Sequence, residues 1–587
     1  MCNLVELFME TAAAYSGKPA VSDDDQVLSY AELDRRSSVL AARLGRLGVA
    51  AEDRVAICLP RSVDTFVAIL GVLKAGAAYV AVDLRYPEAR RDLMIRRSGA
   101  KLILVGPGGR RSLTHFGEAV LEWESGGAFE DVPAAGPVVP PEAAACILFT
   151  SGSSGVPKAI VLEHRNLVAF ARNKGLPTLL PTDRTAQISN VSFDAFSFET
   201  WCSFAYGAEI VVVPPITELL NSDLQRELRR RRISVMLAPT MALNHIVRMD
   251  RNAFSALRIL HTGGDVLLPS TCRDLLAGEF SGEFVNLYGP SEATTACTAY
   301  RVRHVGPDED TVPIGRALDG VTTYVLDADG RPVPQGEMGE LHVGGPGVGR
   351  GYLDQPELTD ERFPPDPFAG DGGRMYATGD LVRERADGLL EFVGRADDQV
   401  KVRGYRVEPG EVERVIGRHP QVRDVVVLPA GDGDGVRLVA FVVVDDTLPP
   451  KELRRSLAGE LPDYMVPSAI LPLQEIPSND HGKRDRQALE QQLHDHQSRW
   501  RGYVPPADGT ERYLSDLWER LLSVEHIGAN DDFFEIGGNS LLAFRVRRML
   551  QQDKGVSIGF RDILDNTVLR DLAKLIDEAA VGIERKG

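Results

Sequence analysis

Short apolar runs that alternate with helical stretches, from Asp53 to about Gly106, most constrain the fold of this chain. The runs D-R-V-A-I-C-L, A-Y-V-A-V and K-L-I-L-V are strand-like, while V-D-T-F-V-A-I-L-G-V-L-K is helical. Further strand-like runs follow at 146–150, 208–213, 235–239 and 258–262. This alternation predicts an α/β fold built on a parallel sheet.

The sequence pattern changes after about residue 300, where short strand-like runs with many glycines favour an antiparallel or barrel-like region. A smaller α+β unit is predicted from near Asp397, with a hairpin that turns on Asp434-Gly435. Residues 493–509 are polar and contain proline and glycine, so we expect a linker there.

The last 75 or so residues are predicted to be helical. Leu514, Leu517, Trp518 and Leu521 have the i, i+3, i+4, i+7 spacing of one helix face. A second helix is expected from Ser540 towards Gly555, with Leu542, Val546, Met549 and Leu550 on one face, and a third after an N-cap at Asn566 or Thr567.

Composition excludes some functions. The chain has 66 basic and 84 acidic residues, a formal net charge of −18, which argues against binding to duplex nucleic acid. Its six cysteines are scattered without a C-x-x-C pair, as expected for free thiols in a reducing, cytoplasmic compartment. Neither a signal peptide nor an apolar run of 18 residues is present, so no membrane span is predicted.

The stretch F-T-S-G-S-S-G-V-P-K, Phe149 to Lys158, follows a predicted strand and precedes a helix-like stretch. Small residues let backbone N–H groups approach an anion, and Lys158 adds positive charge. The spacing differs from G-x-x-x-x-G-K-[ST], because Val-Pro separates Gly155 from Lys158. A flexible surface loop is the alternative, but we favour a phosphate-binding loop.

Two later motifs carry residues suited to a nucleotide. In N-L-Y-G-P-S-E (286–292), Tyr288 could stack on a base and Glu292 could hold Mg²⁺. In Y-A-T-G-D-L (376–381), Asp380 suits two vicinal ribose hydroxyls. Each motif alone is also compatible with a structural turn or loop.

In this order, these motifs resemble those of the adenylate-forming enzymes, and specifically of the adenylation domains of nonribosomal peptide synthetases. The resemblance covers nearly all of residues 1–492 and includes L-K-A-G-A-A-Y-V-A-V-D (73–83), G-R-A-D-D-Q-V-K-V-R-G-Y-R-V-E-P-G-E-V-E (394–413) and H-G-K-R-D-R (481–486). It implies a large α/β subdomain with a barrel portion over 1–396 and a small mobile α+β lid over 397–492. The linker 493–509 and a helical-bundle carrier domain over 510–580 would follow.

The resemblance also implies roles for individual residues. Lys483, on the lid, would contact the substrate carboxylate and the α-phosphate, and Asp397 would be the hinge. Glu292 and Thr150 would form the magnesium site. The ATP-binding residues would be Thr150, Ser151, Gly152, Ser153, Ser154, Gly155, Lys158, Gly263, Gly264, Asp265, Asn286, Tyr288, Asp380 and Arg395.

This sequence departs from the family pattern at two points. Ala159 follows Lys158 where glycine is usual, which is tolerable unless the position needs positive φ. The approach to Lys483, P-L-Q-E-I-P-S-N-D-H-G-K, is longer than the usual Asn-Gly-Lys approach.

The segment V-S-F-D-A-F-S-F-E-T-W (191–201) resembles the start of the family's amino-acid pocket, with Asp194 placed to meet an α-ammonium. The implied pocket residues are Asp194, Ala195, Phe198, Met236, His261, Gly263, Leu287, Thr295 and Ala296. They are mostly apolar, so a hydrophobic L-α-amino acid is predicted, aliphatic first and larger or aromatic second. His261 either packs or bonds a side-chain hydroxyl.

The motif D-D-F-F-E-I-G-G-N-S-L resembles the attachment site of peptidyl carrier proteins, with 4′-phosphopantetheine on Ser540. A serine hydrolase would instead show G-x-S-x-G between a strand and a helix. The predicted activity is formation of an aminoacyl-AMP from an amino acid and MgATP, then loading of the aminoacyl group as a thioester on the chain's own carrier, in a free-standing module.

Two alternatives remain: an acyl- or aryl-acid ligase of the same fold, which Asp194 argues against, and a carrier scaffold with an inactive adenylation domain. Predicted partners are a phosphopantetheinyl transferase, a downstream synthetase or tailoring enzyme, and an MbtH-like activator; neither nucleic acid nor membrane is expected.

Overall fold

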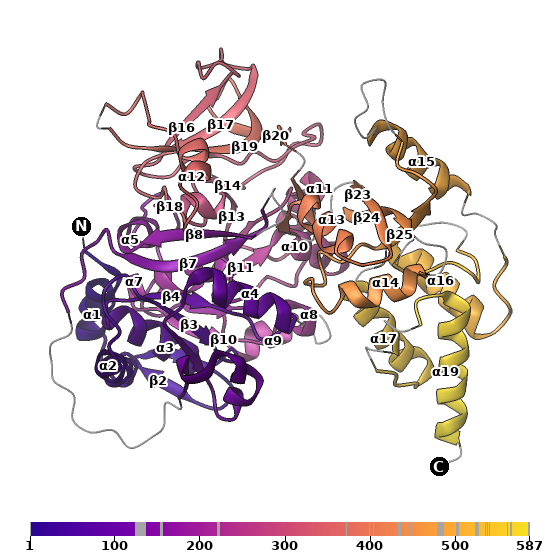
Figure 1. Ribbon diagram of the computed structural model, residues 1–587, viewed down its shortest axis with the longest axis horizontal. Helices are drawn as coiled ribbons and strands as arrows, with labels where there is room; N and C mark the ends of the chain where they lie inside the picture. The colour runs from indigo at the N-terminus through magenta and orange to yellow at the C-terminus, as the bar shows by residue number, and fades with distance from the viewer. Residues whose placement is uncertain are drawn as a thin grey trace. The chain divides into compact units, whose positions relative to one another are not determined.

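The computed structural model divides the chain into two compact units, each described by itself below (Figure 1). The first comprises Met1–Ile216, Leu224–Glu411 and Gly459–Pro462, and the second comprises Thr217–Asp223, Val412–Ala458 and Asp463–Gly587. The structure describes residues 2–123, 137–152, 157–219, 224–370, 372–397, 399–402, 404–431, 436–444, 448–477, 486–499, 504–522, 527–534, 536, 538, 540–559, 562–563 and 566–584.

A seven-stranded sheet of the first unit contains the strands predicted between residues 53 and 150. Its order is β18-β8-β7-β4-β3-β5-β6. The strands are β3 (Arg54–Cys58), β4 (Ala78–Ala81), β5 (Leu102–Val105), β6 (Val120–Glu122), β7 (Ala144–Thr150), β8 (Lys158–Glu163) and β18 (Gly351–Tyr352). The pairs joining β7, β4, β3, β5 and β6 are parallel, as predicted, whereas β8 is antiparallel to both β7 and β18.

A nine-stranded sheet contains the later predicted strands, so the α/β pattern belongs to two sheets. Its order is β15-β14-β13-β12-β11-β9-β10-β1-β2. The strands are β1 (Pro19–Ser22), β2 (Val27–Ser29), β9 (Arg184–Gln187), β10 (Glu209–Val212), β11 (Val235–Pro239), β12 (Ile259–Gly263), β13 (Glu283–Tyr288), β14 (Thr298–Arg301) and β15 (Arg316–Ala317). The centre of the sheet is parallel, and β2, β14 and β15 add antiparallel edges.

The helix α3 (Val63–Lys74) shows why its sequence is apolar nearly all round. Nearly every residue of this helix is buried. The helix contacts β3 and β4 of one sheet, β1 of the other sheet, and the helix α2 (Tyr30–Arg46). A helix covered on all sides buries its whole surface, whereas a surface helix shows a single apolar stripe.

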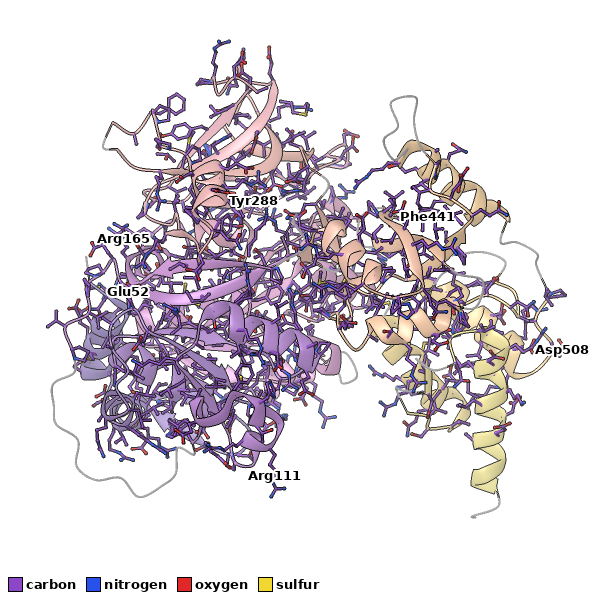
Figure 2. The ribbon with its side chains drawn as sticks, in the orientation of Figure 1. Glu52, Arg111, Arg165, Tyr288, Phe441 and Asp508 are labelled. Carbon is purple, nitrogen blue, oxygen red and sulfur yellow. The ribbon has the colours of Figure 1, made fainter. Side chains whose placement is uncertain are left out.

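The antiparallel region predicted after residue 300 corresponds to a four-stranded antiparallel sheet of order β16-β17-β19-β20. Its strands are β16 (Thr322–Leu326), β17 (Met338–Gly344), β19 (Met375–Glu384) and β20 (Leu390–Arg395). Leu341, Val343 and Val382 of this sheet share a core cluster with Tyr288, which is labelled in Figure 2. This contact places the end of β13 beside the strands that carry Asp380 and Arg395.

The second unit contains the predicted hairpin. The strands β23 (Val422–Ala430) and β24 (Arg437–Val444) pair antiparallel, and β25 (Ala469–Leu473) is parallel to β24. The predicted turn at Asp434-Gly435 lies outside the described residues. The helix α15 (Arg486–Arg499) extends seven residues into the stretch predicted as a linker, so residues 493–499 are helical rather than irregular.

Three predicted helices are present near the C-terminus: α16 (Thr510–Leu522), α17 (Ser540–Lys554) and α19 (Leu569–Glu584). The residues predicted to share a face, including Leu514, Val546 and Leu572, meet in one buried core. The predicted N-cap is wrong, because the backbone N–H groups of Leu569 and Arg570, the first residues of α19, donate to the carbonyls of Asp531 and Ala529 at 3.0 Å instead.

All six cysteines are free thiols, as predicted, and five of them are buried. In the described part of the chain, no helix is both long and apolar enough to cross a membrane.

Candidate functional site

The predicted phosphate-binding loop joins two antiparallel strands. Thr150, the last residue of β7, pairs with Lys158, the first residue of β8. The helix expected directly after Lys158 is therefore absent: β8 runs to Glu163, and the helix α5 (His164–Ala171) begins only after it. The run K-A-I-V-L-E is buried throughout, and such a continuous apolar run suits a central strand as well as a helix.

Ala159 causes no strain, because it pairs with Phe149 in this extended ladder. Ser151 and Gly152 are described, whereas Ser153, Ser154 and Gly155 lie outside the described residues. The role of the loop tip in phosphate binding stays a prediction.

Glu292 is fully buried beside the base of this loop. It accepts hydrogen bonds from the hydroxyl of Tyr352 at 2.8 Å and from Nη1 of Arg406 at 3.1 Å. Burial is the largest single influence on the pKa of Glu292 and raises it, but the charges of Arg406 and Lys158 and the hydrogen bonds to the carboxylate together lower it. Glu292 is thus an anion that is paired with Arg406.

Lys158 is also buried, and its Nζ lies 3.6 Å from Oε1 of Glu408 and 5.8 Å from the ring centroid of Tyr352. Burial lowers the pKa of Lys158, and the Glu408 carboxylate opposes that shift. Lys158 and Glu292 are therefore neighbours linked through Tyr352, as a phosphate and magnesium site would require.

The residues predicted for magnesium fit that ion. The hydroxyl oxygen of Thr150 is buried without a hydrogen-bond partner among the described residues, and Glu292 supplies a carboxylate. Mg²⁺ prefers oxygen ligands and is commonly shared between one or two protein groups and substrate phosphates. Thr150 and Glu292 alone would not fill the coordination sphere of Mg²⁺, so the phosphates of the nucleotide would have to supply further oxygen ligands.

The residues predicted for the nucleoside also come together. Asp380 of β19 lies directly opposite Arg395 of β20 in the ladder, and Arg395 donates to one of its carboxylate oxygens. The hydroxyl of Tyr288 donates to the other oxygen. Burial first, and then the Asp380 charge, raise the pKa of Tyr288, so this phenol stays neutral.

Asn286, Gly263, Gly264 and Asp265 belong to the same region of the nine-stranded sheet. Thr262 and Asn286 are register partners in β12 and β13, and so are Gly263 and Leu287. The Asn286 amide donates to the carbonyl of Pro313 at 2.9 Å, so part of its hydrogen-bonding capacity serves the fold.

The predicted hinge residue, Asp397, is tied to two arginines. Its carboxylate accepts hydrogen bonds from Arg395 at 2.7 and 2.9 Å and from Arg362 at 3.3 Å. Burial is the largest single influence on the pKa of Asp397 and raises it, but Arg395, Arg362 and Arg406 together lower it. The hinge role stays a prediction, as does the role of Lys483, which lies outside the described residues.

The candidate amino-acid pocket begins at Asp194. Its carboxylate accepts a hydrogen bond from the hydroxyl of Ser291, and its backbone carbonyl accepts one from Thr295 at 2.9 Å. Burial raises the pKa of Asp194, while the Ser291 hydroxyl opposes the rise. A partly buried carboxylate without a cationic partner among these contacts is suited to an incoming ammonium group.

The backbone around Thr295 is strained. Thr294 and Thr295 have φ values of 61° and 68°, in the left-handed region that non-glycine residues rarely adopt. Such conformations cost of order 1–3 kcal/mol each and persist where the surroundings hold them. Here Thr294 donates to the carbonyl of Gly347 at 2.6 Å and Thr295 donates to Asp194.

Phe198 and His261, both predicted to line the amino-acid pocket, contact each other. Their ring centroids lie 4.5 Å apart, edge to face, and both side chains are buried. Both ring nitrogens of His261 lack partners among the described residues, and burial lowers its pKa to about 3. His261 is therefore a neutral ring, and both predicted alternatives, packing and a hydrogen bond to a side-chain hydroxyl of the substrate, stay predictions.

The strand register places Met236 and His261 on opposite faces of the sheet, so the pocket role of Met236 stays a prediction. In β11 and β12, Leu237 pairs with His261, whereas Met236 pairs with Leu260. Register partners in a sheet have side chains on the same face, and successive residues alternate, so Met236 faces away from His261. Leu237 shares the buried core cluster of Phe198 and Leu287.

Ser540 is the first residue of α17, as predicted. The preceding motif is structural: Phe533 and Phe534 lie in the buried core, and the buried carboxylate of Asp532 accepts hydrogen bonds from Thr567 and from the backbone of Phe534. The backbone N–H of Gly538 donates to the carbonyl of Phe533 at 2.7 Å, where a side chain would collide with the Phe533 ring. These contacts hold the start of α17 against the helical core.

Sequence reasoning missed four residues that contact the predicted site: Ser291, Tyr352, Arg406 and Glu408. Ser291, Arg406 and Glu408 stand within motifs recognised in the sequence, but no role follows from the motif alone. Their contacts join segments more than 50 residues apart, which a linear pattern does not reveal.

Fold and site together define an ATP-dependent adenylating ligase joined to a carrier domain, and comparisons with known proteins agree. The AMP-binding enzyme model matches residues 8–353, the AMP-binding enzyme C-terminal domain matches 411–483, and the phosphopantetheine attachment site matches 512–576. The chain belongs to the AMP-binding enzyme family.

Its relatives include large peptide synthases. It is 35% identical over 583 residues to tyrocidine synthase 3 of Brevibacillus parabrevis, covering 98% of this chain and 9% of that protein. It is 35% identical over 581 residues to gramicidin S synthase 2 of Brevibacillus brevis, covering 98% and 13%. The chain thus spans only a small part of the length of these relatives.

Among solved structures, the chain is similar to holo-PA1221, described as an NRPS protein containing adenylation and PCP domains bound to a vinylsulfonamide inhibitor. The TM-score is 0.81 at 27% identity, covering 98% of this chain and 97% of that one. The chain accordingly carries an adenylation domain and a carrier domain of the kind found in nonribosomal peptide synthetases.

Proposed function

We propose that this chain activates a hydrophobic L-α-amino acid, aliphatic in first place, and loads it on Ser540. The observation that supports this best is Asp194, whose carboxylate is held by Ser291 and whose chain neighbour Ala195 packs against the apolar cluster of Phe198 and Leu287. A carboxylate beside an apolar wall matches the ammonium group and side chain of such a substrate.

The first half-reaction joins the amino-acid carboxylate to the α-phosphorus of ATP and releases pyrophosphate. Two anions must approach each other, so the site needs positive charge more than covalent chemistry. Lys158 supplies buried positive charge, and Glu292 with Thr150 would hold Mg²⁺, which offsets phosphate charge when bound. Asp380 and Arg395 would orient the ribose, and Lys483 is assigned to the reacting carboxylate and α-phosphate.

In the second half-reaction the aminoacyl group passes to a thiol and AMP leaves. The 4′-phosphopantetheine arm on Ser540 would supply that thiol. A tethered arm raises the effective concentration of the thiol near the adenylate. We further propose that the lid rotates about Asp397 between the two steps, because Lys483 is assigned only to the first.

An ATP–pyrophosphate exchange assay over a panel of L-amino acids tests the activity and the substrate class. Exchange should be strongest with valine, isoleucine or leucine, and weaker with larger or aromatic side chains. Strongest exchange with a charged amino acid would refute the hydrophobic pocket. No exchange with any amino acid, in protein that still binds ATP, would favour an acyl-acid ligase or an inactive scaffold.

The attachment site is tested by intact-mass measurement after incubation with coenzyme A and a phosphopantetheinyl transferase, the partner that attachment requires. The native chain should gain one phosphopantetheine, and Ser540→Ala should gain none. Mass gain that persists in Ser540→Ala would contradict the assignment. A downstream synthetase or tailoring enzyme, an MbtH-like activator and the free-standing role remain predictions.

A further inference from the structure

Two ion pairs in the first unit bring one segment onto the predicted magnesium and phosphate residues. The segment, residues 399–408, contains the two-stranded hairpin of β21 (Val400–Val402) and β22 (Tyr405–Val407). It belongs to the same compact unit as Lys158 and Glu292. We refer to it as the counter-ion segment, leaving out Arg403, which lies outside the described residues.

The first ion pair joins Arg406 to Glu292. Nη1 of Arg406 lies 3.1 Å from Oε2 of Glu292, Nη2 lies 3.5 Å from the hydroxyl of Tyr376, and Nε donates to the side chain of Gln399. The Glu292 side chain is 1% exposed and that of Arg406 is 18% exposed. Arg406 thus places a positive charge against the carboxylate assigned to Mg²⁺.

The second ion pair joins Glu408 to Lys158. Oε1 of Glu408 lies 3.6 Å from Nζ of Lys158, and it also accepts a hydrogen bond from Gln399 at 2.5 Å. Both side chains of this pair are less than a tenth exposed. Glu408 thus places a negative charge against the lysine assigned to a phosphate.

The phosphate loop also holds the backbone of this segment. The hydroxyl of Ser151 donates to the carbonyl of Arg406 at 2.7 Å and accepts from the backbone N–H of Glu408 at 3.2 Å. The backbone between the two charges is therefore anchored to the loop that would contact the nucleotide phosphates. Two unrelated surface ion pairs would not share such an anchor.

We propose that Arg406 and Glu408 are internal counter-ions that take the charge positions of Mg²⁺ and of a phosphate, and that they lower the affinity of the site for MgATP. A buried charge without a partner is costly, so Glu292 and Lys158 need compensation whenever the nucleotide is absent. MgATP brings the same two charges and must displace the counter-ion segment. The proposal rests on the assignment of Glu292 and Lys158 to MgATP binding.

Calorimetric titration of the full chain with ATP, without amino acid, tests this directly. Arg406→Met should bind ATP roughly tenfold more tightly than the native chain when Mg²⁺ is present. It should show no gain in EDTA, because the vacated position suits only the metal. Glu408→Gln should bind ATP more tightly both with Mg²⁺ and in EDTA, because Lys158 meets the phosphate itself.

Arg301→Met is the matched control. Arg301 forms an ion pair with Glu283 at 2.9 Å on the surface of the same unit, and both side chains are more than 40% exposed. This variant removes one arginine–glutamate pair without touching the site, so its affinity for ATP should equal that of the native chain.

Weaker or unchanged MgATP binding in Arg406→Met would overturn the proposal, since weaker binding would make Arg406 a phosphate ligand. A native chain that binds no MgATP would instead refute the assignment of Glu292 and Lys158. Hydrogen–deuterium exchange of the native chain provides a measurement that needs no variant. Exchange over 399–408 should rise when MgATP is added, and a fall or no change would contradict displacement.

Discussion

The contact most open to a quantitative test is the one expected between Asp194 and the substrate ammonium group. Asp194→Asn keeps the shape of the side chain and an oxygen that can accept from Ser291, but it removes the charge. Losing one partner of a buried ion pair costs about 3–5 kcal/mol, and a hydrogen bond to a charged group contributes about 1.5–3 kcal/mol. Because Asp194 is only partly buried, we take about 3 kcal/mol.

That energy corresponds to a loss of about two orders of magnitude in kcat/KM, since 1.4 kcal/mol is a factor of ten. The loss should lie mainly in KM, because the ammonium contact exists in the ground state and the transition state alike. The assay is amino-acid-dependent ATP–pyrophosphate exchange with the preferred substrate of the native chain. The Kd for MgATP should change far less than KM for the amino acid, because Asp194 affects the residues assigned to MgATP only through its charge repulsion with Glu292.

Ser291→Ala provides a graded comparison. It keeps the charge of Asp194 but removes the hydroxyl that holds the carboxylate, so kcat/KM should fall roughly tenfold, for the loss of about 1.5 kcal/mol. An α-hydroxy acid of the same side chain gives a second comparison. It lacks the ammonium group, so its disadvantage relative to the amino acid should shrink in Asp194→Asn.

Two results would refute this reasoning. A kcat/KM for Asp194→Asn within about threefold of the native value would mean that no ammonium group meets this carboxylate. Equal losses for the amino acid and the α-hydroxy acid would mean that Asp194 acts through structure alone. The pH dependence adds a check: since burial raises the pKa of Asp194, KM should rise as the pH falls through a pKa above the ordinary aspartate value.

Three further predictions concern stability, packing and the lid. Burial lowers the pKa of His261 to about 3, so only the unfolded chain takes up a proton here, and about 2 kcal/mol of stability should be lost between pH 6.5 and pH 5. In His261→Leu the urea midpoint should therefore depend less on pH than in the native chain. The same change of midpoint with pH in both proteins would contradict this. Gly289→Ala would place its Cβ 2.6 Å from Cα of Ala296, so the free energy of unfolding should fall by about 1–3 kcal/mol, and the affinity for MgATP should fall with it. Gly45→Ala is the control: its Cβ would have no neighbour within 4 Å, so neither quantity should fall. Lys483→Ala should abolish pyrophosphate exchange yet still transfer a preformed aminoacyl-adenylate to the carrier, and equal loss of both steps would contradict the lid assignment.

The pattern of apolar residues predicted helices and strands well where the residues of the element itself decide its conformation. The strand-like runs near residues 54–58 and 259–263 are strands, and α3 follows its apolar run from Val63 to Lys74. Pattern failed where an apolar run suits either state, as after Lys158, and where a polar residue has a distant partner, as with Thr567 and Asp532. In both cases tertiary contacts outweigh local preference.

The sequence by itself determined which residue types stand beside one another along the chain. Motif order therefore identified the family and placed Ser540 at the start of a helix, and it predicted the nucleotide-binding segments. These properties depend on neighbours in the chain, which the sequence states directly.

Only the tertiary structure decided which faces and charges meet. The pairing register of β11 with β12 turned Met236 away from His261, because side chains alternate across a sheet and register is a property of two strands. Arg406 and Glu292 are 114 residues apart, and folding brings their charges to 3.1 Å. Electrostatic energy depends on distance through space, so the counter-ions of this site became visible only in the folded chain.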